Sequence, residues 1–194
     1  LIGGDSFSGA LSRDPGEGVG SYAISQGTLT AGPNYTITYA GANLTISALA
    51  ITVTADAQGK YYGDADPGLT YTCTPSLVGS DVFSGSLTRD PGEDANTYAI
   101  NQGTLTAGAN YTITFTGAYL TISPLAITVT ADAQGKAYGA ADPALAYDCT
   151  PSLIGGDSFS GALSRDPGEA VGSYAINQGT LAAGATTPSP SSPT

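Results

Sequence analysis

Arginine and glutamate recur four residues apart on either side of a Pro-Gly turn, and these side chains are the best suited to chemistry. The pairs are Arg13 with Glu17, Arg89 with Glu93, and Arg165 with Glu169. A guanidinium held beside a carboxylate could bind an anionic ligand or position the carboxylate for proton transfer. Exposed pairs of this kind more often brace a turn, and each contributes roughly 0–1 kcal/mol to stability. We therefore expect structural ion pairs here and no catalytic residue.

Asp64 and Asp66 are the candidate metal ligands, because extracellular repeat modules often bind calcium through carboxylate oxygens. Their spacing fits no EF-hand loop, and Ala140 stands where a second copy of Asp64 would be needed. Aspartate beside proline, as in Asp66-Pro67, also forms turns. We expect turn-forming aspartates with no metal and no cofactor, and calcium is the alternative.

Cys73 lies in the segment YTCTPSL and Cys149 in YDCTPSL, so the two cysteines hold equivalent places. A small domain is roughly 30 Å across, whereas the Cα atoms of a disulfide approach within about 7 Å. The two cysteines should therefore not bridge each other in a straight array of domains. Each is either a buried free thiol or half of a cross-chain disulfide formed in an oxidising compartment.

Two kinds of glycosylation candidate are present. Asn34, Asn43 and Asn110 each begin an Asn-x-Thr triplet, although such triplets also arise by chance in a threonine-rich chain. The segment 186–194 is rich in Pro, Ser and Thr, a composition typical either of O-glycosylated stalks or of plain linkers. Its candidate acceptors are Thr186, Thr187, Ser189, Ser191, Ser192 and Thr194.

Composition excludes several classes of function. The chain has no His, so the usual Ser-His-Asp and Cys-His nucleophiles and His-containing zinc sites are ruled out. With 16 acidic against 5 basic residues and a net charge of −11, it lacks the positive charge that binds nucleic acid or anionic lipid. No apolar run approaches the length of a membrane span. We expect no nucleic acid partner and no membrane insertion in this segment.

One unit is repeated along the chain. The segment ITVTADAQGK begins at Ile51 and again at Ile127, a spacing of 127 − 51 = 76 residues. This period predicts small domains joined in series. We expect residues 1–50 to be the later part of a first repeat, 51–126 a complete repeat, 127–185 a third repeat without its last strands, and 186–194 a tail.

Within each repeat, apolar and polar residues alternate. ITVTADA places Ile51, Val53 and Ala55 on one face, and YTITFT does the same with Tyr111, Ile113 and Phe115. This alternation predicts half-buried antiparallel strands. We expect an all-β chain of small β-sandwich-like domains, with β-grasp-like single sheets as the alternative. Because one repeat runs into the next with almost no linker, the domains should form a rod.

The chain resembles the MBG domains of the YGX type, tandem modules of large bacterial surface adhesins and filamentous exoproteins. The residues that carry the resemblance are Tyr62-Gly63, Ala65-Asp66-Pro67, Gly79, Asp81, Gly85, Leu87, Arg89, Pro91-Gly92-Glu93, Tyr98, Ile100, Gly103, Leu105, Asn110-Tyr111-Thr112-Ile113 and Leu120-Thr121-Ile122. The third repeat matches through Tyr138-Gly139, Asp142-Pro143, Arg165 and Gly168-Glu169. This resemblance implies a module of an adhesin stalk without catalytic activity.

We therefore expect a non-enzymatic, extracellular, cell-surface protein that acts as a structural module of a fibre or stalk. Each end of the chain lacks strands that the other end possesses, so copies could complete one another head to tail by strand exchange and form a filament. The alternative is an adhesin domain that binds carbohydrate or protein. The expected partners are further copies of the chain and host or environmental glycans.

Overall fold

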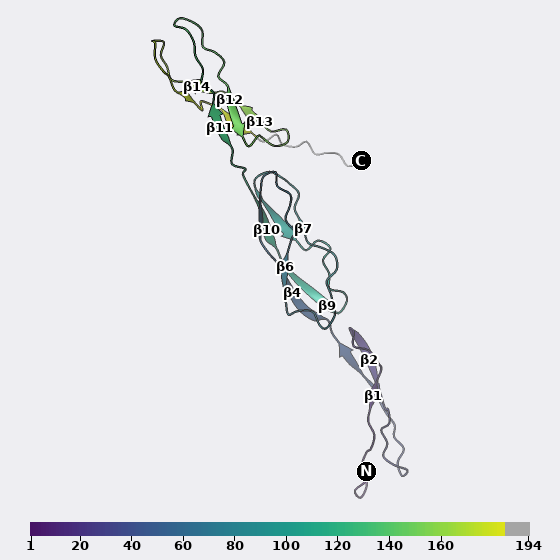
Figure 1. The fold of residues 1–194 in the computed structure, drawn as a ribbon. Helices are drawn as coiled ribbons and strands as arrows, with labels where there is room; N and C mark the ends of the chain where they lie inside the picture. Colours follow the sequence, from purple (N-terminus) through teal and green to yellow (C-terminus); the bar gives the residue numbers. More distant parts are fainter. Residues whose placement is uncertain (185–194) are drawn as a thin grey trace, which may run out of the picture. The chain divides into compact units, whose positions relative to one another are not determined.

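The computed structural model describes residues 1–184, in which every regular element is a β-strand (Figure 1). No helix in this part of the chain is long and apolar enough to cross a membrane. The chain divides into two compact units. The first contains Leu1–Gln58, Gly68–Pro91 and Tyr98–Leu120, and the second contains Gly59–Pro67, Gly92–Thr97 and the residues from Thr121 onward. The boundary between the units thus crosses the second repeat.

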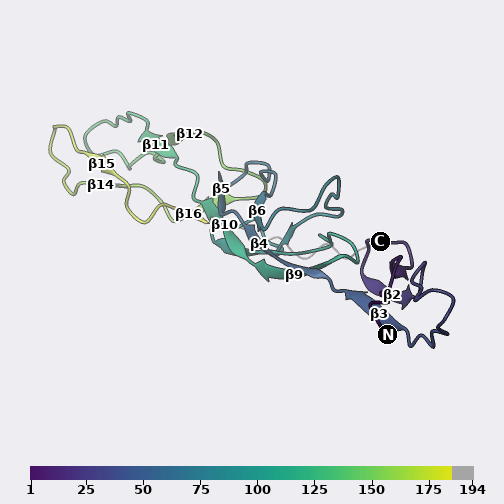
Figure 2. The same ribbon diagram turned by 90° about the horizontal axis from the view of Figure 1, so that it is seen from below.

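The first sheet of the second repeat has the order β6-β4-β9, with β4 (Leu49–Ala55) between β6 (Tyr71–Thr74) and β9 (Tyr111–Thr116). Figure 2 shows these strands beside one another. β4 is antiparallel to β6 but parallel to β9, with Ile51 opposite Ile113. The prediction of purely antiparallel strands is wrong for this pair, because alternation defines the two faces of a strand but not its partner.

A second sheet has the order β5-β10-β8-β7, with β5 at Gln58–Tyr61, β10 at Ala118–Ser123, β8 at Thr97–Asn101 and β7 at Thr88–Arg89. β7 and β8 are antiparallel, with Arg89 opposite Ile100. The chain passes from the first sheet to the second between β9 and β10, where only Gly117 separates the strands.

The core of the second repeat lies between these two sheets. Ile51 and Val53 of β4 are 2% and 0% exposed, and they pack in one cluster with Ile100 of β8 and Leu120 of β10. The threonines that alternate with them in β4 are exposed. The all-β, tandem-repeat prediction is therefore confirmed, and one core shared by two sheets corresponds to a sandwich-like domain rather than a single sheet.

The first repeat contains one described sheet, of order β1-β2-β3, with β1 at Ser12–Arg13, β2 at Gly20–Ser25 and β3 at Ala42–Ile46. Both pairings are antiparallel. Residues 35–39, YTITY, repeat the sequence of β9 almost unchanged, yet they form no strand. In the second repeat the same sequence forms β9, which pairs in parallel with β4.

The third repeat forms three strand pairs: β11 (Thr128–Ala131) with β12 (Tyr147–Thr150), β13 (Ser158–Ser160) with β16 (Ala182–Gly184), and β14 (Ser164–Arg165) with β15 (Ile176–Asn177). All three pairings are antiparallel. Within the described residues β11, the counterpart of β4, pairs on one side only. The predicted tail, 186–194, lies outside the described residues.

Candidate functional site

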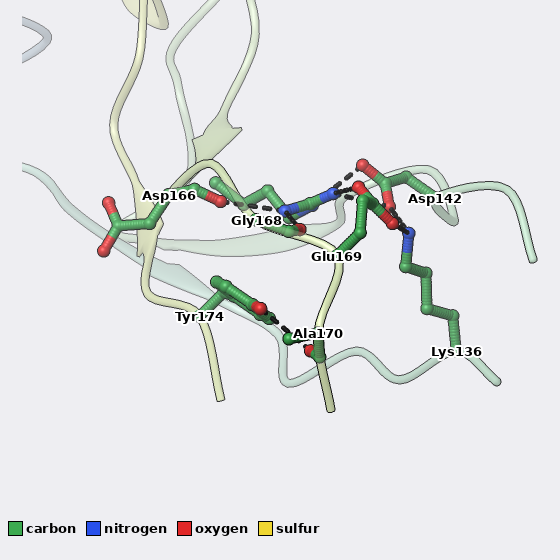
Figure 3. A network of polar contacts seen from close by, with 8 residues as sticks. Lys136, Asp142, Asp166, Gly168, Glu169, Ala170 and Tyr174 are labelled. Atoms are coloured by element: carbon green, nitrogen blue, oxygen red, sulfur yellow. Dashed lines mark hydrogen bonds and ion pairs between the residues drawn. The ribbon is translucent and has the colours of Figure 1, made fainter. Parts of the chain in front are cut away.

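Four charged side chains meet in the third repeat (Figure 3). Asp142 accepts from Lys136 Nζ at 2.6 Å and from Arg165 Nε at 2.8 Å, and Glu169 accepts from Lys136 Nζ at 2.7 Å and from Arg165 Nη2 at 2.5 Å. The two cations therefore each contact both anions. The four formal charges cancel, which leaves no excess charge at this site to attract an ion.

The turn after β14 holds Arg165 in place. Its Nη1 donates to the carbonyl oxygens of Asp166 at 2.8 Å and Gly168 at 2.7 Å, and the guanidinium lies 5.4 Å from the centre of the Tyr174 ring. Gly168 has a φ of +142°, and a Cβ at this position would overlap Tyr174. Glycine at position 168 therefore lets the turn pack against the Tyr174 ring, and the Arg165 guanidinium interacts favourably with the π face of that ring.

The electrostatics of the cluster follow from these contacts. Hydrogen bonds from Arg165 and then Lys136 lower the pKa of Asp142 to about 2, and those from Lys136 and Arg165 also lower the pKa of Glu169. The same bonds to Asp142 and Glu169 raise the pKa of Lys136. All four groups are thus held in their charged forms near neutral pH, whereas a general acid or base needs a pKa close to the working pH.

Lys60 makes the corresponding contacts in the second repeat. Its Nζ lies 2.7 Å from Asp66 and 2.5 Å from Glu93, and its side chain is only 4% exposed. The hydrogen bonds that Lys60 donates to Asp66 and Glu93 raise the pKa of Lys60, so the ammonium group stays protonated. Lys60 and Lys136 were not predicted as site residues. The signal that could have found them is their recurrence in the segment AQGK one repeat apart.

The two calcium candidates both contact this lysine. Asp66 accepts from Lys60 through its carboxylate, whereas Asp64 accepts from Lys60 through its backbone carbonyl at 3.0 Å. The Asp64 carboxylate accepts from the backbone N–H of Tyr61 at 3.2 Å, as a turn former does. Among residues 1–184 no three or more acidic or cysteine side chains gather in a way that could hold a metal ion.

The arginines of the other repeats have surroundings like those of Arg165. Arg13 pairs with Glu17, donates to the carbonyl of Gly16 at 2.6 Å and lies 5.5 Å from the centre of the Tyr22 ring. Arg89 donates to the carbonyl of Asp90 at 2.9 Å and lies 5.4 Å from the ring centre of Tyr98. The Arg89–Glu93 pair stays a prediction.

Both cysteines are free thiols that are half-buried. The Cys73 thiol donates to the carbonyl of Pro75 at 3.1 Å, and the Cys149 thiol donates to that of Pro151 at 3.2 Å. Cys73 also packs against the core of the second repeat. These contacts fit the free-thiol alternative, and cross-chain pairing stays a prediction.

The glycosylation candidates differ in their surroundings. Asn34 and Asn43 are exposed. Asn110 is exposed too, but its Oδ1 accepts from the backbone N–H of Val19 at 2.9 Å. The tail candidates Thr186, Thr187, Ser189, Ser191, Ser192 and Thr194 lie outside the described residues, and glycosylation stays a prediction.

A surface cleft of about 390 Å³ adjoins the charged cluster of the third repeat. Lys136, Asp142 and Glu169 line it together with Tyr138 and Val171. Tyr138 is 79% exposed and Val171 is 91% exposed. The cleft therefore presents apolar side chains beside a neutral ion-pair network.

Comparison with known proteins places this architecture in a family. No curated protein and no solved structure matched the chain. The MBG domain (YGX type) matches residues 1–45, 51–121 and 127–186, segments that follow the repeats of the sequence and cover nearly all of it. This family comprises repeat modules of surface adhesin-like proteins, and its segments contain the Tyr-Gly pairs and the charged clusters described above. The chain belongs to the MBG domain (YGX type) family.

Proposed function

We propose that the chain is a non-enzymatic, structural module of an extracellular fibre or stalk on a bacterial surface. The main support is the way the first repeat joins the second. Only Ser47 and Ala48 separate β3 from β4. Such a short connection cannot act as a flexible linker, so the two repeats have little freedom to move independently.

Hydrogen bonds reinforce this junction. The backbone carbonyl of Asn110 accepts from the backbone N–H of Leu49 at 2.9 Å. The side-chain Oδ1 of Asn110 accepts from the backbone N–H of Val19, also at 2.9 Å. Asn110, directly before β9, thus contacts both the start of β4 and a loop of the preceding repeat. This double contact supports a rod-like series of domains, which stays a prediction.

The charged clusters support a structural rather than a catalytic role. They occur at equivalent positions in the second and third repeats, and each places a lysine ammonium within 2.7 Å of two carboxylates. An active site copied in successive domains of a stalk would be unusual, whereas bracing of a turn is needed in every domain. We infer from this repetition that the chain has no enzymatic activity.

Strand exchange is the finer part of the proposal. In the second repeat β4 has β6 on one side and β9 on the other, whereas β11 pairs only with β12 within the described residues. Residues 35–39 have the sequence of β9 without a strand partner. We propose that this segment of one copy pairs in parallel with β11 of another, because an unpaired strand edge readily accepts a further strand.

Electron microscopy of the purified chain tests strand exchange. We expect filaments whose number rises with protein concentration, and we expect Ile37→Pro to abolish them because proline removes a backbone donor from the exchanged segment. Thr38→Ala, which keeps the backbone donor, is the matched control and should leave the filaments intact. Isolated particles at every concentration, or filaments unaffected by Ile37→Pro, would contradict strand exchange.

The alternative function is binding of carbohydrate or protein by an adhesin domain. The cleft beside Tyr138 and Val171 favours it, since exposed aromatic and apolar groups next to charged ones are suited to a sugar or peptide surface. Glycan-array binding by the chain that is lost in Tyr138→Ala and kept in Tyr119→Ala would support this alternative. Absence of binding to any glycan would count against its carbohydrate form.

A further inference from the structure

A Tyr-Gly pair occurs at Tyr62–Gly63, directly after β5, and recurs one repeat later at Tyr138–Gly139. Both glycines have a positive φ, +87° and +79°, which only glycine adopts readily. The two pairs therefore have closely similar backbones. They differ in what they contact.

The Tyr62–Gly63 pair of the second repeat contacts the third repeat, within the same compact unit. Gly63 packs so closely against Ile154 that an added Cβ would overlap the Ile154 Cδ1 atom. The Tyr62 hydroxyl donates to the Asp157 carboxylate, a bond that also raises the pKa of the tyrosine. Ile154 and Asp157 are the two ends of one turn, closed by a bond from Asp157 N to Ile154 O at 3.2 Å.

This turn recurs in every repeat, and we name it the docking turn: Ile2–Asp5, Val78–Asp81 and Ile154–Asp157. Each is closed by the same bond between its ends, at 3.1 to 3.2 Å. The first residue is 79% exposed at Ile2 and 64% at Val78, but half-buried at Ile154. Among the described residues, Ile154 is the one that meets a Tyr-Gly pair. Burial of the docking turn thus accompanies contact with that pair.

In the first two repeats the aspartate of the docking turn accepts from a tyrosine of its own repeat. Asp5 accepts from Tyr35 at 2.7 Å and Asp81 accepts from Tyr111 at 2.6 Å, in each case within one repeat. A carboxylate has about four lone-pair positions, so a bond from its own repeat leaves room for a tyrosine from a neighbouring one. The acceptor that Asp157 offers to Tyr62 is therefore present in Asp5 as well.

The Tyr138–Gly139 pair has a similar backbone, but among the described residues no docking turn packs against Gly139. Tyr138 is 79% exposed, and a Cβ on Gly139 would meet nothing within 4 Å. We infer that each Tyr-Gly pair is a socket for the docking turn of a neighbouring repeat, and that Tyr138–Gly139 receives the Ile2–Asp5 turn of a second copy of this chain. This inference rests on the proposed stalk function and identifies the surfaces that join its modules.

The filled socket is tested in the intact chain by amide hydrogen exchange at Asp157. Tyr62→Phe removes the hydroxyl that holds the docking turn, so we expect the Asp157 amide to exchange about tenfold faster, the effect of losing one hydrogen bond to a charged group. Tyr138→Phe is the matched control and should leave Asp157 unchanged. Equal exchange at Asp157 in both variants would overturn the socket.

A second pair of variants tests the packing. Gly63→Ala and Gly139→Ala introduce a methyl group at nearly the same positive φ, but only Gly63 faces Ile154. We expect exchange of the Asp157 amide to rise in Gly63→Ala alone. Backbone strain alone would act equally in the two variants. In that case the amides after residue 139 would exchange faster in Gly139→Ala, as those after residue 63 would in Gly63→Ala.

The open socket is tested by sedimentation velocity. We expect self-association that weakens at least tenfold in Tyr138→Phe/Gly139→Ala and in Ile2→Ser, and that persists in Tyr119→Phe, which removes the hydroxyl of another exposed tyrosine. A monomer at every concentration, or association unchanged in all variants, would overturn docking between copies. Glycan binding lost in the socket variants without any change in association would also overturn it, in favour of the adhesin alternative.

The two proposals can fail separately. Filaments that survive Tyr138→Phe/Gly139→Ala and vanish in Ile37→Pro would support strand exchange and contradict the socket between copies. Conversely, a rise in Asp157 exchange in Tyr62→Phe without filaments under any condition would support the internal socket and contradict the filament.

Discussion

The charge of Asp142 is stabilised by the two cations beside it. Arg165 and Lys136 hold its pKa at about 2, below the ordinary value of 3.8. Because the folded pKa is lower than the unfolded one, the stabilisation is complete above the unfolded value and is lost as the pH falls through the folded one. The charged cluster of the third repeat should therefore weaken in acid between about pH 4 and about pH 2.

We expect the difference in melting temperature between the wild-type chain and Asp142→Asn to be largest above about pH 4 and to vanish near pH 2. Circular dichroism at a series of pH values measures it. Asp148→Asn, a change outside the cluster in β12, is the control and should show a small difference throughout. A pH-independent difference for Asp142→Asn would mean that the carboxylate is not stabilised by its charge.

The two thiols give a second prediction. Since Cys73 and Cys149 are half-buried and each donates to a nearby carbonyl, we expect both to remain reduced and to react slowly with a thiol reagent until the chain unfolds. Intact mass spectrometry with and without reductant measures this. Covalent dimers that disappear with reductant would instead support the cross-chain disulfide.

Strand β10 shows how the same sequence position differs between repeats. Leu120 in GAYLTIS is 0% exposed, whereas Leu44 in GANLTIS is 40% exposed. We expect Leu120→Ala to lower the free energy of unfolding by roughly 2–5 kcal/mol, because it leaves a cavity between the two sheets. Leu44→Ala is the matched control, with an expected loss below about 1 kcal/mol. Denaturant unfolding measures both, and equal losses would contradict the assignment of the core.

The alternation of apolar and polar residues was enough to predict which face of a strand is buried. Ile51, Val53 and Ala55 alternate with exposed threonines, and all three are buried, as the period of two requires. The parallel partner of β4 was not predictable, because β9 shows the same alternation whichever strand it pairs with. Contacts between repeats, such as Gly63 with Ile154, were also missed, since they join segments far apart in the sequence.

Net charge governs how copies of the chain approach one another. At −11, two copies repel each other, and salt screens this repulsion over roughly 10 Å at 0.1 M. We expect self-association to strengthen as salt is raised towards about 0.5 M, because the apolar part of the docking turn is insensitive to screening. Sedimentation at several salt concentrations measures this, and association that weakens with salt would indicate an interface made mainly of ion pairs.

The parallel pairing of β4 with β9 has a mechanical consequence. Tension along the chain enters the second repeat at the start of β4, which is paired with β9 from Leu49 opposite Tyr111 to Thr54 opposite Thr116. Pulling on that end loads these ladder bonds together, in shear, instead of peeling them apart one at a time. A strand that must slide as a whole resists force far better than one that unzips.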